Sequence, residues 1–133
     1  MRCDLHHVHL FASELDESLR FYRDLFGAEI VFDEIVAGVR NVLVRIGTGH
    51  INFYDQPPRE TGKNAVHHLG ILTDDLAALV AHMQEKGFPC RSPVRDFGDL
   101  KYIMLEGPDR VLIEVFEKKA PAPGDTGPGS SGG

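Results

Sequence analysis

One order of structural signals occurs twice along this chain of 133 residues, and that repeat constrains the fold more than any other feature. Each copy opens with a histidine-rich stretch, Leu-His-His-Val-His-Leu at 5–10 and Val-His-His-Leu-Gly-Ile at 66–71. A helix pattern and three short strand-like runs follow in both copies. The landmarks correspond at a nearly constant spacing: His7 with His68, Gly27 with Gly87 and Asn52 with Glu114. The repeat predicts a βαβββ module used twice.

The first copy contains a helix with a recognisable start and end. Ser13 is followed three residues later by Asp16, so the Ser13 hydroxyl can accept from a free backbone N–H while acidic residues favour the helix N-terminus. Apolar residues then recur at helical spacing, and Gly27 is typical of a helix end. Strands are predicted at 29–32, 39–46 and 50–54, with a tight hairpin turn at Gly47-Thr48-Gly49.

The second copy repeats this order. A histidine strand at 66–72 leads to Thr73-Asp74-Asp75 as a helix start, and Gly87 ends the helix pattern. Strands are predicted at 88–92, 101–105 and 111–116. We therefore divide the chain into a first module at 1–56, a linker at 57–65, a second module at 66–119 and a disordered tail at 120–133, all within one domain.

Composition narrows the class of protein. The content of 42% hydrophobic and 26% charged residues is that of a globular protein, and a net charge of −6 argues against a nucleic-acid binder. No apolar run approaches the length of about 20 residues that a membrane span needs. Cys3 and Cys90 are too few for a disulfide framework, so we expect a cytoplasmic protein with free thiols.

Four polar side chains occupy matching points of the two copies. In an extended strand His7 shares a face with His9, and in the second copy His68 takes the equivalent place. Glu114 lies inside an apolar run, where an ionised carboxylate needs a partner or a metal, and Asn52 holds the equivalent position in the first copy. Two modules related by a pseudo-twofold axis would bring these groups together, which predicts a site for a divalent transition metal.

The chain resembles the vicinal oxygen chelate superfamily, which includes glyoxalase I, methylmalonyl-CoA epimerase, fosfomycin-resistance proteins, extradiol dioxygenases and bleomycin-binding proteins. The resemblance covers residues 5 to about 117 and rests on His-Val-x-Leu, on Ser-Leu-Arg-Phe-Tyr-Arg-Asp-Leu-Phe-Gly at 18–27 and on Ile113-Glu114-Val115. It implies an α+β fold in which the two βαβββ modules form a concave, barrel-like mixed sheet with one helix per module outside. It also implies metal ligation by His7, His68 and Glu114, with Asn52 at a variable fourth point, and a homodimer.

The sequence departs from several relatives at catalytic positions. Glyoxalase I has a carboxylate where this chain has Asn52, and the epimerases have a carboxylate base where it has Asn41. An asparagine amide cannot act as a general base at ordinary pH. What remains is a site of two histidines and one carboxylate, the pattern of extradiol dioxygenases and fosfomycin-modifying proteins. The run Gly107-Pro108-Asp109-Arg110 replaces a common Asp-Pro-Asp-Gly and changes the turn before the last strand.

Other side chains could act beside the metal, each with a plainer alternative. The catalytic candidates are His9, Asn41 and Tyr54, and the substrate-binding candidates are Arg45, Arg95 and Tyr102. The alternatives are a water contact for His9, packing for Tyr54 and a solvated side chain for Arg45 or for Arg95 in a loop near the mouth of the site. Only one of Lys101 and Tyr102 can face the cavity. We take His6, His50 and His67 as structural residues and His82 as a helix-surface residue.

These features favour an enzyme in which a divalent Fe, Mn, Ni, Co or Zn ion binds and activates a small substrate through its oxygen atoms. The reaction class stays open among isomerase, lyase, thiol transferase and dioxygenase. The alternative function is a non-catalytic protein that binds a small molecule, as bleomycin-resistance proteins do.

Overall fold

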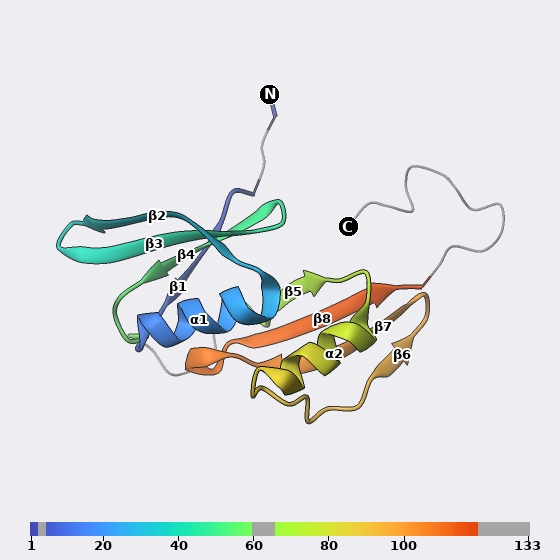
Figure 1. Cartoon of the computed structure of the whole chain (residues 1–133). Helices are drawn as coiled ribbons and strands as arrows, with labels where there is room; N and C mark the ends of the chain where they lie inside the picture. The colour runs from blue at the N-terminus through green and yellow to red at the C-terminus, as the bar shows by residue number, and fades with distance from the viewer. Residues whose placement is uncertain (3–4, 60–65, 120–133) are drawn as a thin grey trace. The chain divides into compact units, whose positions relative to one another are not determined.

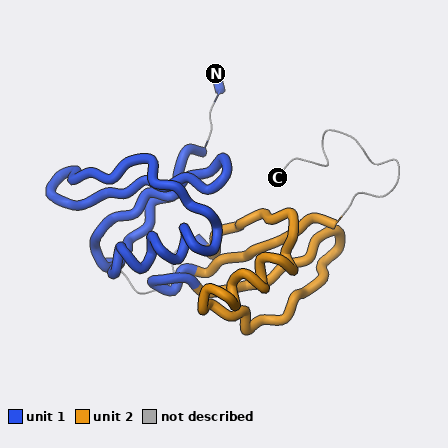
Figure 2. Tube along the Cα trace, viewed as in Figure 1, with its two compact units in different colours: residues 1–66, 107–111 blue, residues 67–106, 112–133 orange. Residues whose placement is uncertain are grey.

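Each half of the chain folds into one helix and one four-stranded sheet (Figure 1). The computed structural model describes residues 1–2, 5–59 and 66–119. Two compact units result, one of residues 1–66 with 107–111 and one of residues 67–106 with 112–133 (Figure 2). Residues 60–65 of the predicted linker and the predicted tail at 120–133 lie outside the described residues.

The first module contains five elements: β1 (Val8–Phe11), α1 (Leu15–Phe26), β2 (Glu29–Val36), β3 (Val39–Ile46) and β4 (Gly49–Tyr54). Its sheet has the strand order β1-β4-β3-β2. β1 runs parallel to β4, and the two hairpins β2–β3 and β3–β4 are antiparallel. The turn between β3 and β4 is tight, because Ile46 pairs with Gly49, as the glycine pattern predicts.

The second module repeats this topology: β5 (Leu69–Leu72), α2 (Leu76–Glu85), β6 (Arg95–Phe97), β7 (Leu100–Glu106) and β8 (Leu112–Lys118). The strand order is β5-β8-β7-β6, and β5 runs parallel to β8. A short 3₁₀ turn, η1 (Pro108–Arg110), precedes β8 and belongs to the unit that contains the first module.

Strand register confirms the repeat. Val8 pairs with Ile51 in the first sheet, and Leu69 pairs with Ile113 in the second. Val8 and Leu69 each follow directly after one of the corresponding histidines, and Ile51 and Ile113 each precede one of the corresponding polar residues, Asn52 and Glu114. The predicted pair of βαβββ modules is therefore confirmed, with the strands in two separate four-stranded mixed sheets and not in a closed barrel.

Each helix buries its apolar stripe against its own sheet. In the first module Tyr22 and Phe53 have ring centroids 5.2 Å apart and are almost fully buried. In the second module Leu76 and Met83 of α2 are buried, as is the sheet residue Ile113. Burial of such side chains is the main stabilising term of each module. No helix within the described residues combines the length and hydropathy needed to cross a membrane.

The start of α1 differs from the prediction, whereas its end agrees. Glu14 is the N-cap residue and makes no side-chain capping bond. The Ser13 hydroxyl does not cap the helix; instead the Ser13 backbone N–H donates to Oδ2 of Asp109, far along the chain, at 3.0 Å. Gly27 ends the helix in the left-handed conformation with φ 70°, which glycine adopts without steric penalty. In α2 the Asp75 side chain accepts from the Ala78 backbone N–H, as its position predicts.

Two strand predictions need correction. The strand predicted at 88–92 is wrong, because Pro89 within the segment and Pro93 directly after it lack backbone donors, and the next strand begins only at Arg95. Arg95 therefore lies on β6 and not in a loop, and a turn with Gly98 at φ 60° joins β6 to β7. The strand predicted at 29–32 continues to Val36, because the β2–β3 turn lies at Ala37 and Gly38, both at positive φ.

The histidine strands are shorter than predicted. β1 begins at Val8 and β5 at Leu69, so His7 and His68 lie immediately before their strands. Their side chains are therefore not held by the alternation of a paired strand, and local contacts decide where the rings point.

Candidate functional site

The first sheet turns one face toward α1 and carries most of the predicted site residues on the other. Phe53 packs against α1, and side chains alternate along a strand, so Asn52 and Tyr54 point away from the helix. The ladders place His9 beside Asn52 and Asn41 beside Tyr54. Since paired residues on neighbouring strands share a face, all four side chains lie on the face opposite α1.

Two buried amides on this face are joined in a fixed direction. Nδ2 of Asn41 donates to the Val39 carbonyl at 3.1 Å, and Nδ2 of Asn52 donates to Oδ1 of Asn41 at 3.0 Å. A main-chain carbonyl can only accept, so it determines which atom of the Asn41 amide faces Asn52. Asn41 and Asn52 are 6% and 8% exposed, and within the described chain Oδ1 of Asn52 has no hydrogen-bond partner. A buried acceptor is therefore left free on the site face.

His9 and Tyr54 form an aromatic pair next to these amides. Their ring centroids lie 4.8 Å apart in an edge-to-face arrangement, and His7 lies 6.5 Å from His9 by the same measure. Burial, and then the neighbouring charge of His7, lower the pKa of His9 below its ordinary value. Both effects favour the neutral imidazole, which can accept a proton or a hydrogen bond.

The second sheet presents a histidine and a carboxylate. Nε2 of His68 lies 3.9 Å from Oε2 of Glu114, with both side chains about one-third exposed at 33% and 28%. Glu114 pairs with Gly70 on β5 and with Met104 on β7. Glycine leaves open the space beside the carboxylate, where an added Cβ would meet, among the described residues, a ring carbon of Phe116 at 3.7 Å.

Register places the two groups of polar residues at equivalent positions. Asn52 pairs with His9, and Glu114 pairs with Gly70, so the first module offers a neutral oxygen where the second offers a carboxylate. His7 and His68 each stand just ahead of these β1 and β5 positions, with one residue between. Each module therefore provides one imidazole and one oxygen at matching points.

The remaining predicted residues divide into those near these groups and those engaged elsewhere. Tyr102 shares a face with Phe116 and Glu114 because it pairs with Phe116 across the ladder, and Arg95 pairs with Tyr102. Lys101 forms an ion pair with Glu117 at 3.1 Å on the side of the sheet that faces α2. Of the two neighbours Lys101 and Tyr102, it is therefore Tyr102 that lies on the same face as Glu114.

Arg45 lies on the site face of the first sheet but is already paired. Its Nη2 donates to Oε2 of Glu29 at 2.6 Å, with the arginine side chain 49% exposed. An arginine held in such a pair must exchange it before it can bind a substrate anion.

No three His, Cys, Asp or Glu side chains lie close enough to hold a metal ion within residues 1–2, 5–59 and 66–119. The structure brings His68 near Glu114 in one module. In the other it places His9 and Asn52 on one face, with the ring of His7 6.5 Å from that of His9. The sequence reasoning took His6 and His67 as structural and missed their direct contacts with the predicted ligands His7 and His68. The repeated His-His dipeptide was the available signal.

The chain thus combines two βαβββ modules with polar residues on the sheet faces opposite the helices, and this combination defines its class of protein. The chain belongs to the Glyoxalase/Bleomycin resistance protein/Dioxygenase superfamily, whose sequence profile matches residues 4–115. It is 24% identical over 123 residues to the uncharacterized protein YaeR of Escherichia coli (strain K12), covering 86% of this chain and 95% of YaeR.

Two solved structures illustrate the range of this fold. The fosfomycin resistance protein FosX from Listeria monocytogenes matches with a TM-score of 0.72 at 16% identity, covering 90% of this chain and 96% of FosX. TnmS3, an antibiotic binding protein from Streptomyces sp. CB03234, matches with a TM-score of 0.71 at 19% identity, covering 89% of this chain and 98% of TnmS3. FosX has also been solved in complex with Mn(II) and sulfate.

The residues of this chain fit a divalent ion chemically. Among the described residues Oδ1 of Asn52 is a buried oxygen without a donor, the kind of group that a hard cation satisfies. Imidazole nitrogen and carboxylate oxygen, as in His68 and Glu114, are ligands that first-row transition metals prefer. Their mutual distance of 3.9 Å is too long for a hydrogen bond between them, so neither group satisfies the other.

Proposed function

We propose that this protein is a divalent-metal-dependent enzyme that acts on a small molecule bearing oxygen donors. His7, His68 and Glu114 are the proposed metal ligands, with Oδ1 of Asn52 as a fourth. The observation that carries the proposal is the buried Oδ1 of Asn52, which has no partner in the described part of the chain and stands at the position equivalent to Glu114. A buried acceptor without a donor destabilises the fold, so its presence is accounted for if it has a ligand.

A bound divalent ion supplies Lewis acidity that polarises a substrate oxygen and stabilises negative charge developing there. The residues of the chain carry out the other tasks. His9 accepts a proton or hydrogen bond from the substrate, and the phenol of Tyr54 donates to a substrate oxygen. Asn41 cannot act as a base, and its part is to hold Asn52.

Metal binding is the first test. Protein stripped with EDTA is reconstituted separately with Fe(II), Mn(II), Co(II), Ni(II) or Zn(II), and bound metal is measured by titration calorimetry and elemental analysis. One equivalent per chain is expected for at least one ion. Glu114→Gln and His68→Ala should each lower the affinity by more than the roughly 10–100-fold that loss of a residue outside the coordination sphere causes. Absence of stoichiometric metal from every reconstituted sample would eliminate the proposal.

A matched control is available on the same strand. Glu117 is a carboxylate on β8 that points toward α2, where it accepts from the Leu76 backbone N–H at 2.8 Å. Glu117→Gln should leave metal affinity at neutral pH unchanged. An equal loss of affinity in the Glu117 and Glu114 variants would mean that a general change of charge or stability, and not ligation, is responsible.

Activity and simple binding are separated with candidate oxygen-bearing compounds, beginning with catechols and fosfomycin. Oxygen consumption and product formation are measured with and without EDTA, and thermal stabilisation is measured in parallel. Turnover that EDTA abolishes supports the enzyme. Ligand stabilisation that is unaffected by EDTA, without turnover, favours a binding protein like TnmS3.

A further inference from the structure

The tandem histidines make the same contact in both modules. Nδ1 of His6 lies 2.9 Å from Nδ1 of His7, and Nδ1 of His67 lies 2.8 Å from Nδ1 of His68. The two ring pairs are nearly perpendicular, at 90° and 82°, with centroids 5.2 and 5.1 Å apart. Two dipeptides that are distant in the sequence, one at the start of each repeat, thus reach one local geometry.

Chemistry restricts how such a pair is protonated. Two ring nitrogens at this distance form a hydrogen bond only if one of them carries a proton and the other a lone pair. In a neutral imidazole that carries its proton on Nδ1, the lone pair lies on Nε2. Nε2 of His68 is the atom on the Glu114 side, so a proton on Nδ1 of His68 leaves a lone pair directed toward the carboxylate.

The geometry points to His6 and His67 as positioning residues for His7 and His68. Each upstream imidazole accepts the Nδ1–H of its neighbour, which fixes the tautomer and orientation of that ring and leaves Nε2 free to bind a cation. Metal-binding histidines commonly donate their second N–H in this way, and the hydrogen bond raises the basicity of the ligating nitrogen. Both the direction of the hydrogen bond and the role in cation binding rest on the proposed function, because the two Nδ1 atoms of each pair can exchange donor and acceptor roles.

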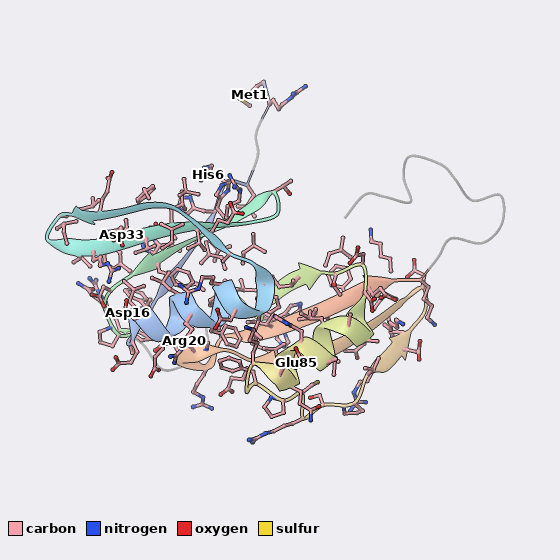
Figure 3. The ribbon with its side chains drawn as sticks, in the orientation of Figure 1. Met1, His6, Asp16, Arg20, Asp33 and Glu85 are labelled. Atoms are coloured by element: carbon pink, nitrogen blue, oxygen red, sulfur yellow. The ribbon has the colours of Figure 1, made fainter. Side chains whose placement is uncertain are left out.

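In the first module the upstream ring is itself held by the sheet. The rings of His6, labelled in Figure 3, and His50 on β4 are stacked at 4.7 Å with an interplanar angle of 6°. Nδ1 of His50 also lies 3.2 Å from the His6 carbonyl oxygen. When Asn52 is aligned with Glu114, His50 falls on Leu112 of the second module, so this support belongs to the first module alone. His50→Leu should therefore alter His7 and leave His68 unchanged.

Long-range ¹H–¹⁵N NMR of the imidazole rings in the metal-free full chain tests the tautomers directly. The spectra are recorded at about pH 8.5, above the ordinary histidine pKa. His7 and His68 should carry the proton on Nδ1, and His6 and His67 on Nε2. His67→Ala should change the tautomer population of His68 alone, while His67→Gln, whose side-chain carbonyl can accept, restores it. His82→Ala on α2 serves as the control histidine.

Metal affinity gives the second readout. His6→Ala and His67→Ala should each weaken binding about 10–100-fold. The Gln variants should recover most of that loss, and unfolding midpoints should stay unchanged because the pairs are exposed. A proton on Nε2 of His68 in the native chain, or unchanged metal affinity in both Ala variants, overturns the inference while leaving the proposed function intact. The expected tautomers in a chain that binds no metal support the pairing and eliminate the proposed function.

Discussion

Replacing Asn41 and Asn52 together by leucine is expected to stabilise the fold while removing the proposed oxygen ligand. In the native chain Oδ1 of Asn52 is buried without a partner, as far as the described residues extend. Such an unsatisfied acceptor costs about 1–3 kcal/mol, whereas replacing both members of a buried hydrogen-bonded pair by apolar groups is nearly neutral. The double variant should therefore gain about 1–3 kcal/mol in the free energy of unfolding.

The single variants should behave differently from the pair. Asn41→Leu leaves both polar atoms of the Asn52 amide unpaired, so it should destabilise by about 1–3 kcal/mol. Asn52→Leu removes one orphaned oxygen but strands Oδ1 of Asn41, so its net effect should be close to zero. The Val39 carbonyl belongs to a half-buried residue, and water can replace the donor it loses.

Urea unfolding of the full chain measures these differences, because a change in midpoint at constant m-value reports stability. The expected order of stability is the double variant, then native protein and Asn52→Leu together, then Asn41→Leu. Metal affinity should fall in every variant. If the double variant is destabilised by the sum of the two single effects, the amide pair is an ordinary structural contact and the reasoning fails.

Three further outcomes follow from individual contacts. Glu117 accepts hydrogen bonds from the Leu76 backbone N–H and from Lys101, and these lower the pKa of its carboxyl below the ordinary value of 4.5. The ionised carboxylate therefore stabilises the fold above that pH, and this contribution is lost as the pH falls through the lower pKa of the folded state. Unfolding midpoints measured below pH 4.5 should decline less steeply for Glu117→Gln than for native protein. Gly27→Ala should destabilise by about 1 kcal/mol in thermal unfolding, since φ is 70° there. Arg110→Gly should stabilise by a similar amount, since Arg110 holds φ 63°, and an unchanged melting temperature would contradict the assigned conformation.

The duplicated fold could be predicted because its signals are local and occur twice. Strand alternation, helix periodicity and turn glycines each depend on a few neighbouring residues, and the constant spacing between the two copies confirmed them against each other. Two local predictions were wrong. One failed because the contact comes from a distant residue, and the other because two sequence signals in the same segment disagree. Asp109 reaches the start of α1 from the other half of the sequence, which no capping pattern reveals. The strand predicted at 88–92 failed because Pro89 within it and Pro93 directly after it outweigh the apolar content of the segment.

For the candidate site, strand alternation was enough to place side chains on faces but not to identify their partners. The position of Asn52 opposite α1 follows from its place between Ile51 and Phe53. Its hydrogen bond to Asn41 depends on the register of β3 against β4, which sets those two residues diagonally on one face. A local pattern carries no information on that register. The contacts of the tandem histidines were likewise hidden, because the rings precede their strands and escape the alternation rule.

Asn52 offers a neutral amide oxygen where Glu114 offers a charged carboxylate, and under the proposed function this difference sets the net charge of the metal site. Two neutral imidazoles, the Asn52 amide and the Glu114 carboxylate together carry one negative charge, so a divalent ion among them would leave the site with one net positive charge. A carboxylate in place of Asn52 would cancel that charge. Opposite charges attract strongly where water is partly excluded, so the retained charge favours substrates that present an anionic oxygen or develop one during reaction. Because the Val39 carbonyl orients Asn41, and Asn41 accepts from Nδ2 of Asn52, Oδ1 of Asn52 is turned away from Asn41, and under the proposed function it would bind the ion without adding a charge.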